Sequence, residues 1–397
     1  DADPYQGRVL TGRVQSGGLS QNETIHALRT DGSVIETARV TKLLSFRGLD
    51  RISVESVQAG DIVAIAGLQK ATVADTLADL SVNKPILAPP IDPPTLSIRF
   101  AINDSPLAGR DGDKVQSRVI RDRLLAEAEG NVAIQVKETN DKDAFEVAGR
   151  GELQLGVLVE TMRREGFEMT IGRPKVLYRQ DPETGQRQEP VEDVTVDVDN
   201  EFTGVVVEKI SERRGEMTEM RPFGAGRTRI AFLAPTRGLI GYHGEFLTDT
   251  RGTGIMHRLY RGYATYFGPI LGRHRGAIVS AQTGTAVPFA LWNFEERGIL
   301  FIGPGEQVYE GMIIGENAKL SDLEVNPLKA KQLTNIRAAG KDDAVRLTPP
   351  RRMSLEQAIA YIGEDEVVEV TPNHTRLRKA ILDPHKRKRE RRAAMAQ

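Results

Sequence analysis

Three short loops in the second half of the chain combine arginine with glycine, and this combination is suited to binding phosphate. They are Glu212-Arg-Arg-Gly215, the segment 236–244 (TRGLIGYHG) and the segment 250–254 (TRGTG). Glycine lets backbone N–H groups approach an anion, and a guanidinium can donate two parallel hydrogen bonds to a phosphate. Packing gives no reason for repeated Arg-Gly in loops. The predicted phosphate contacts in these loops are Arg213, Arg214, Arg237, His243 and Arg251.

Basic charge is gathered in patches although the whole chain is close to neutral, with 54 Lys+Arg and 55 Asp+Glu. Residues 237–275 carry six arginines against two acidic side chains, a net of +4, and residues 326–352 carry seven against two, or +5. Residues 376–392 carry nine against two, or +7. Clustered cations favour phosphate through counterion release, independently of sequence. The patches add Arg258, Arg273, Lys341, Arg351, Arg352, Arg376, Arg378 and Lys379 to the predicted RNA contacts.

Two of these basic regions allow a second interpretation. The segment 385–392 (HKRKRERR) is either an RNA-binding element or an ordinary solvated tail. Four aromatic side chains lie among the arginines of the patch 237–275, where they could stack on RNA bases. Strand alternation would instead bury some of them in a sheet. These four residues are Tyr260, Tyr263, Tyr266 and Phe267.

Catalytic motifs are missing from the sequence. With no cysteine, thiol catalysis and Cys-ligated zinc are excluded, and the six histidines show no HExxH spacing, so we expect no metal site. A P-loop needs GxxxxGK[ST], but Gly340-Lys341 is followed by Asp342. No GxSxG elbow marks a nucleophilic serine. No apolar run reaches the ~18 residues that a membrane span needs, so we expect a cytoplasmic protein without membrane contact.

The periodicity of the sequence predicts four domains. Residues 5–80 alternate apolar and polar side chains between Gly and Asp turns, which is typical of a small antiparallel β-barrel, domain 1–92. Five prolines between positions 84 and 95 then indicate a stiff linker. Residues 96–179 follow the order strand, helix, strand, strand, helix, strand, which predicts a ferredoxin-like sandwich, domain 93–182. Leu155, Leu158, Val159 and Met162 form its helical core stripe.

A second unit with the same order of elements occupies residues 188–276, so the chain carries two ferredoxin-like α/β sandwiches. Residues 277–397 form a fourth domain, in which Ser354 and Gln357 have the spacing of a capping box at a helix start. The predicted fold class is therefore multidomain β and α+β.

Long stretches resemble known translation factors. Residues 149–179 (GRGELQLGVLVETMRREGFEMTIGRPKVLYR) are similar to the third domain of elongation factor G, and residues 200–220 to its fifth. Residues 237–263 (RGLIGYHGEFLTDTRGTGIMHRLYRGY) and 326–362 resemble the TypA/BipA family, and fit LepA-type factors less well. The resemblance implies a translation-factor β-barrel, the two sandwiches and a family-specific C-terminal domain, without the G domain that carries GTP and Mg²⁺.

The resemblance implies a monomer that binds the ribosome at both subunits. It implies contacts with rRNA, ribosomal proteins and A-site tRNA, and roles in large-subunit assembly and translation under stress. The family's C-terminal loop reaches the acceptor end of the tRNA, and its match here is the segment 328–340, with Lys329, Lys331, Asn335 and Arg337. The alternatives are a scaffold that binds ribosomal proteins, a LepA- or elongation factor G-like fragment, and an enzyme with a pocket between domains.

Overall fold

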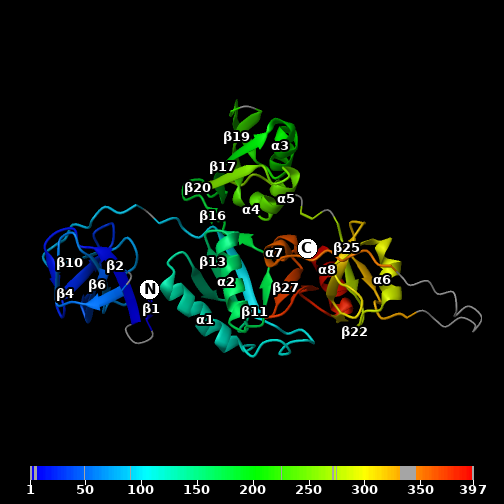
Figure 1. Cartoon of the computed structure of the whole chain (residues 1–397), viewed down its shortest axis with the longest axis horizontal. Coiled ribbons are helices and arrows are strands. Elements are labelled where there is room, and N and C mark those ends of the chain that lie inside the picture. The colour runs from blue at the N-terminus through cyan, green and yellow to red at the C-terminus, as the bar shows by residue number, and fades with distance from the viewer. Residues whose placement is uncertain are drawn as a thin grey trace, which may run out of the picture. The chain divides into compact units, whose positions relative to one another are not determined.

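The computed structural model describes residues 2–3, 7–48, 50–89, 91–224, 226–270, 272–273, 275–330 and 346–395. The chain divides into two compact units. The first comprises residues 1–94 with 121–136, and the second comprises residues 95–120 with 137–397. Each unit is described by itself below (Figure 1).

The β-rich part of the first unit is built from short antiparallel strands. These are β1 (Ala2–Asp3), β2 (Gly7–Arg13), β3 (Gly18–Ser20), β4 (Thr24–Leu28), β5 (Val34–Arg39), β6 (Lys42–Arg47), β7 (Asp50–Ser53), β8 (Ser56–Gln58), β9 (Ile62–Ala66) and β10 (Thr76–Asp79). They form a sheet β1-β2-β9-β6-β7, a sheet β10-β4-β5 and the pair β3-β8. The predicted strands and turns are present, but hydrogen bonds between described residues do not join these sheets into one closed ring.

The first predicted sandwich has the expected order of elements. It consists of β11 (Leu96–Ile102), α1 (Ser117–Gly130), β12 (Gln135–Glu138), β13 (Ala144–Gly149), α2 (Glu152–Arg164) and β14 (Met169–Gly172). The sheet order β12-β13-β11-β14 is that of a ferredoxin-like fold. The predicted stripe on α2 is core, because Leu155, Val159 and Met162 have no exposed surface and Leu158 is 4% exposed. Two short strands follow, β15 (Lys175–Val176) and β16 (Arg179–Gln180).

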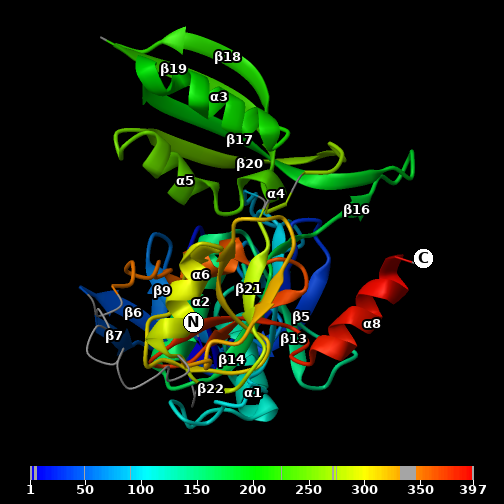
Figure 2. The same cartoon turned by 90° about the vertical axis from the view of Figure 1, so that its right-hand side faces the viewer.

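The second sandwich repeats this topology. It consists of β17 (Arg187–Asp199), η1 (Asn200–Phe202), α3 (Thr203–Glu212), β18 (Glu216–Pro222), β19 (Arg227–Pro235), α4 (Thr236–Leu239), α5 (Tyr242–Asp249) and β20 (Ile255–Thr265). Its strands lie in the order β18-β19-β17-β20. Val194, Val196 and Val198 of β17 pack with α3 and α5 in one core, so both helices cover the same face (Figure 2).

The C-terminal region extends the sheet of the first sandwich. Its elements are β21 (Ala277–Ser280), β22 (Gly284–Thr285), α6 (Pro288–Glu295), β23 (Gly298–Leu300), β24 (Gln307–Val308), β25 (Met312–Asn317), β26 (Leu323–Val325), α7 (Leu355–Tyr361), β27 (Glu366–Val370), β28 (Thr375–Lys379) and α8 (Pro384–Met395). Strand β27 pairs antiparallel with β14, from Met169 opposite Val370 to Gly172 opposite Val367. One sheet therefore runs from β12 through β14 and β27 to β26.

Local signals in the C-terminal region are also confirmed. Ser354 accepts the backbone N–H of Gln357 while the Gln357 side chain accepts that of Ser354, which is the predicted capping box of α7.

Within the described residues, the helices are all too short or too polar to cross a bilayer. The same residues contain no cluster of three or more His, Asp or Glu side chains that could hold a metal ion.

Candidate nucleic-acid interface

The backbone N–H groups of the Arg-Gly loops are already occupied inside the protein. In the 250–254 loop, Arg251 donates its N–H to Thr248, Gly252 to Leu247, and Gly254 to the Thr250 hydroxyl. These bonds close the carboxyl end of α5, a position where left-handed Arg251 (φ 51°) and Gly252 (φ 78°) terminate a helix. The prediction that this loop cradles an anion with its backbone is therefore wrong.

The 236–244 loop does bind an anion, but the anion belongs to this chain. Gly241 donates its N–H to a carboxylate oxygen of Glu152, the first residue of α2, at 2.9 Å. The other Glu152 oxygen lies 3.3 Å from Nη1 of Arg258. Gly241 has a φ of 73°, and a Cβ there would lie 2.5 Å from the Cβ of Ala360 on α7. Glycine at this position thus lets the loop pack against α2 and α7.

Arg237 is held by a buried carboxylate. Its guanidinium donates to both oxygens of Glu189, a residue with no exposed surface, and also to the carbonyl of Gly268. Burial by itself would lower the pKa of Arg237, yet the Glu189 carboxylate raises it overall. With 14% of its side chain exposed, Arg237 offers little of its guanidinium to a phosphate.

Arg258 forms a similar pair across the second sandwich. It donates to the two carboxylate oxygens of Glu192 at 2.8 and 3.0 Å, in the bidentate geometry that favours guanidinium–carboxylate pairs. Through Glu152 it also joins β20 to α2 of the first sandwich. Arg258 therefore connects two domains of the same unit.

Four predicted contacts at the start and end of the C-terminal region are paired in the same way. Arg273 forms two hydrogen bonds of 2.9 Å with Glu366, and Lys379 lies within 2.9 Å of Asp322, Asp365 and Glu366. Burial would lower the pKa of Lys379, but Glu366 and the two aspartates raise it. Arg376 pairs with Glu369, and Arg378 with Asp104.

Six of the predicted contacts are engaged in ion pairs within the protein. Each is at most 22% exposed and faces a carboxylate that folding brings against it. Arg213 is covered to the same extent. An ion pair of this kind must be broken before the cation can bind an external phosphate. The six are Arg237, Arg258, Arg273, Arg376, Arg378 and Lys379.

Three further predicted contacts combine a partner with some exposure. Arg213 pairs with Glu245 and lies 4.7 Å from the ring centre of Tyr242. Arg351 pairs with Glu316 at 3.0 Å and is 40% exposed. Arg352 pairs with Glu306, and 62% of its side chain is exposed. Exposed ion pairs are weak, so Arg351 and Arg352 remain accessible to an anion.

Four predicted contacts are exposed, and none of them forms an ion pair shorter than 3.9 Å with a carboxylate of the described residues. Arg214 ends α3 with a φ of 65°, and its Nε donates to the carbonyl of Pro269. Arg251 is 76% exposed and lies 3.9 Å from an exposed Glu201. His243 on α5 and Lys329 after β26 are exposed. The predicted contacts Lys331, Asn335, Arg337 and Lys341 lie outside the described residues.

Tyr263 on β20 and Tyr266 just after it are partly exposed and contact arginines. The Tyr263 hydroxyl donates to the carbonyl of Leu177, and the Arg179 guanidinium lies 4.1 Å from the Tyr263 ring centre. Tyr266 lies beside Tyr178, with Arg187 within 5.0 Å of both ring centres. The cation–π contacts of Arg179 and Arg187 were not predicted, because they join strands that are distant in sequence.

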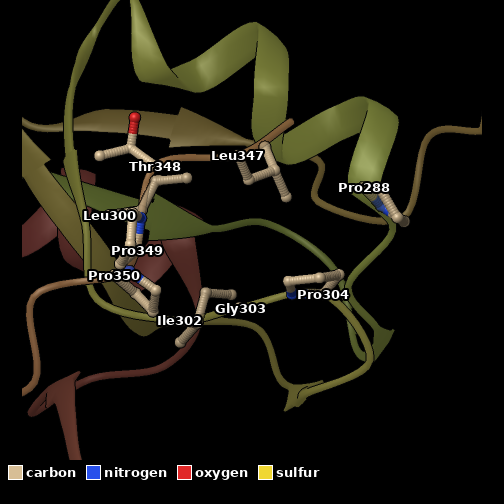
Figure 3. Close-up of a pocket in the computed structure, with 9 residues that line it drawn as sticks. All are labelled: Pro288, Leu300, Ile302, Gly303, Pro304, Leu347, Thr348, Pro349 and Pro350. Carbon is tan, nitrogen blue, oxygen red and sulfur yellow. The ribbon is translucent and has the colours of Figure 1, made fainter. Parts of the chain in front are cut away.

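One pocket in the C-terminal region, of about 330 Å³, is unsuited to phosphate (Figure 3). Its walls come from Leu300, Ile302, Leu347 and four prolines, and none of the residues that line it carries a charge. Such a lining offers no side chain for acid or base chemistry, and its one hydroxyl, that of Thr348, has no titratable neighbour in the lining to activate it.

Comparisons with known proteins agree with this architecture. Residues 7–78 match the model of elongation factor Tu domain 2, and residues 186–273 match that of the elongation factor G C-terminus. A chain with these two modules has the architecture of a translation factor. Residues 275–384 match the TypA/BipA C-terminal domain.

Similar curated proteins come from distant bacteria. The chain is 45% identical to the large ribosomal subunit assembly factor BipA of Escherichia coli (strain K12) over 394 residues, covering 99% of this chain and 64% of that protein. Proteins of the same name from Haemophilus influenzae and Synechocystis sp. are 43% and 44% identical, with 98% and 96% of this chain and 63% of each relative covered. The chain belongs to the TypA/BipA family and spans somewhat less than two thirds of these relatives' length.

Proposed function

We propose that this chain binds the large ribosomal subunit through rRNA phosphates and acts in the assembly of that subunit. The proposal rests on one observation above all, the 45% identity over 99% of the chain to a large ribosomal subunit assembly factor. Exposed cations on the second unit, Arg214, Arg251 and Lys329, provide the chemistry that phosphate requires. Binding is therefore electrostatic and independent of base sequence.

The same proposal covers the finer partners that family membership implies. In the ribosome the chain contacts rRNA, ribosomal proteins and the acceptor end of A-site tRNA. The tRNA contact is assigned to Lys329, Lys331, Asn335 and Arg337 of the segment 328–340. The protein is a cytoplasmic monomer that acts during translation under stress. GTP hydrolysis belongs to a G domain, since this sequence contains no P-loop.

Co-sedimentation with purified large ribosomal subunits tests the proposal. We expect the chain to pellet with the subunits at low salt, to be released as salt rises, and to hydrolyse no GTP. Failure to pellet at the lowest salt would overturn the proposal. GTP turnover by the pure chain would favour the enzyme hypothesis instead.

A protein-binding scaffold is the second candidate, and the edge strand β18 favours it. Every residue of Glu216–Pro222 is exposed, including Met217 at 49% and Met220 at 45%. An unpaired strand edge with exposed methionines is suited to pairing with another protein. After mild nuclease treatment of the subunits, surviving binding supports this second candidate, whereas lost binding supports the RNA proposal.

A further inference from the structure

The basic segment at the end of the chain forms a helix, α8, whose start is firmly fixed. Asp383 accepts the backbone N–H groups of His385 and Lys386 at 2.7 and 3.1 Å, which caps the helix. These two bonds lower the pKa of Asp383, so it stays ionised and caps the helix at neutral pH. Just before it, Leu382 packs against the core of the C-terminal domain.

Arg387 anchors one side of α8 to that domain. Its guanidinium donates to the carbonyls of Ile381 and Leu382 and to the Glu324 carboxylate at 2.9 Å. Only 15% of the Arg387 side chain is exposed. In Figure 2 the carboxyl end of α8 points away from the strands of its domain. One side of the helix is thus turned toward the protein and the rest toward solvent.

The outer face of α8 carries basic side chains in helical register. His385, Lys388, Arg389 and Arg392 recur at i, i+3, i+4 and i+7, so they lie along one face. Seven residues at ~1.5 Å each spread them over about 10 Å of the helix axis. All four are exposed, and we find no ion-pair partner for any of them among the described residues. We call these four residues the α8 basic face.

The α8 basic face differs from the charged helix surface of α2. There, the Glu160 carboxylate forms ion pairs with both Arg163 and Arg164, with its oxygens 2.7 and 2.8 Å from their Nε atoms. On α8, like charges lie next to each other, and such pairs destabilise a helix. The single acidic residue of α8, Glu390, is three residues from Arg387 and therefore lies toward the anchored side. A polyanion would relieve the repulsion.

The composition of this face restricts what it can bind. A membrane-surface helix needs an apolar face, and residues 385–392 contain no apolar side chain. Single-stranded RNA is usually held by aromatic stacking, and the segment has no Phe, Tyr or Trp. Lysine and arginine along a rigid rod are suited to the phosphates of a double helix.

We propose that the α8 basic face binds the phosphate backbone of double-stranded RNA. The match to the TypA/BipA C-terminal domain ends at residue 384, the first residue of α8, so this contact lies beyond the matched domain. Because the ribosome is rich in RNA duplex, the inference deepens the proposed function and depends on it for its biological partner.

The test compares variants of the full chain in binding to a fluorescent RNA duplex of about two helical turns, over a series of salt concentrations. The test variant is K388Q/R389Q/R392Q, which removes three cations and keeps good helix formers. The matched control is K137Q/K142Q/K175Q, which removes three exposed lysines elsewhere in the same unit. A charge-preserving variant, K388R/R389K/R392K, completes the set, and circular dichroism checks that each is folded.

We expect the test variant to bind at least about tenfold more weakly, with a slope of log K against log salt reduced by about 2 to 3. The control and the charge-preserving variant should bind like the unmodified chain. Equal affinity of the test variant and the control would overturn the proposal. So would preferential binding of the unmodified chain to vesicles of phosphatidylcholine with phosphatidylserine rather than to the duplex.

Co-sedimentation separates this inference from the proposed function. If the unmodified chain binds large subunits and the test variant binds equally well, the α8 proposal fails and the proposed function stands. If the unmodified chain binds the RNA duplex through α8 but does not bind subunits, the proposed function fails and the duplex-binding chemistry stands.

Discussion

At the scale of single residues, the structure separates arginines that stabilise the fold from arginines that are available to a ligand. Arg237 and Arg214 both lie beside the segment 268–269, where they donate to neighbouring carbonyls. Arg237 also faces the buried Glu189, whereas Arg214 is exposed and its guanidinium donates only to the Pro269 carbonyl among the described residues. Removing one partner of a buried pair leaves an uncompensated charge, which costs about 3–5 kcal/mol. Exposed cations contribute little to stability but much to polyanion binding.

The two arginines therefore give opposite expected results. Arg237→Gln should lower the free energy of unfolding by about 3 kcal/mol, because Glu189 stays buried without its cation. Arg214→Gln should change it by less than about 0.5 kcal/mol. Urea unfolding followed by circular dichroism measures both. A stable R237Q protein would show that the pair with Glu189 does not stabilise the fold.

Ribosome binding should show the reverse order. Arg214→Gln should weaken binding to large subunits and reduce the salt slope by about 1, as expected for one lost phosphate contact. Arg237→Gln, measured where it is folded, should keep the unmodified slope. An unchanged slope for R214Q would remove Arg214 from the proposed contacts.

At the scale of elements, α2 carries a charge cluster that stabilises its last turn. Hydrogen bonds from Arg163, and then from Arg164, lower the pKa of Glu160 to about 2. Burial by itself would raise this pKa, but the hydrogen bonds outweigh it. A folded-state pKa below the unfolded one means that the ionised form is stabilised by folding. The stabilisation is complete above the unfolded pKa of about 4.5 and is lost as the pH falls toward 2.

Glu160→Gln should therefore lower the free energy of unfolding at pH 7 by about 1 kcal/mol, with a smaller difference at acid pH. Unfolding in urea at several pH values between neutrality and about 2 measures the convergence of the two proteins. Glu212→Gln, at the exposed end of α3, is the control. A pH-independent difference between E160Q and the unmodified chain would contradict the ion-pair explanation.

The sequence predicted local features well and long-range partners poorly. Helical and strand periodicity and the Ser354–Gln357 capping box act within a few residues, so the two sandwiches and the start of α7 are confirmed. The partner of Arg237 is 48 residues away, and β27 pairs with a strand about 200 residues earlier. Basic patches in the sequence could not reveal these carboxylates, so the internal ion pairs of six predicted contacts were not foreseen.

At the scale of the whole second unit, the shared sheet makes two predicted domains into one body. The sequence pattern predicts residues 93–182 and 277–397 to be separate domains. In the structure, however, β14 of the first region pairs with β27 of the second over four residues. Buried Glu369 on β27 strengthens the junction by accepting hydrogen bonds from Ser105, Tyr309 and Arg376. We expect these regions to unfold together.

Val368→Ala tests this coupling, because Val368 is fully buried on β27 opposite Ile171. The lost packing should cost about 2 kcal/mol. Hydrogen exchange followed by mass spectrometry should show faster exchange in both β11–β14 and β21–β28. Acceleration confined to β27 and its C-terminal neighbours would mean that the two regions unfold separately.

The central claim is that exposed cations of the second unit bind ribosomal RNA phosphates. Its most direct test is the affinity of the full chain for purified large ribosomal subunits between about 0.05 and 0.3 M monovalent salt. We predict a linear fall of log K with log salt, with a slope of about −3 or steeper, since Arg214, Arg251 and Lys329 alone offer three phosphate contacts. An affinity that stays constant across this range would contradict the claim.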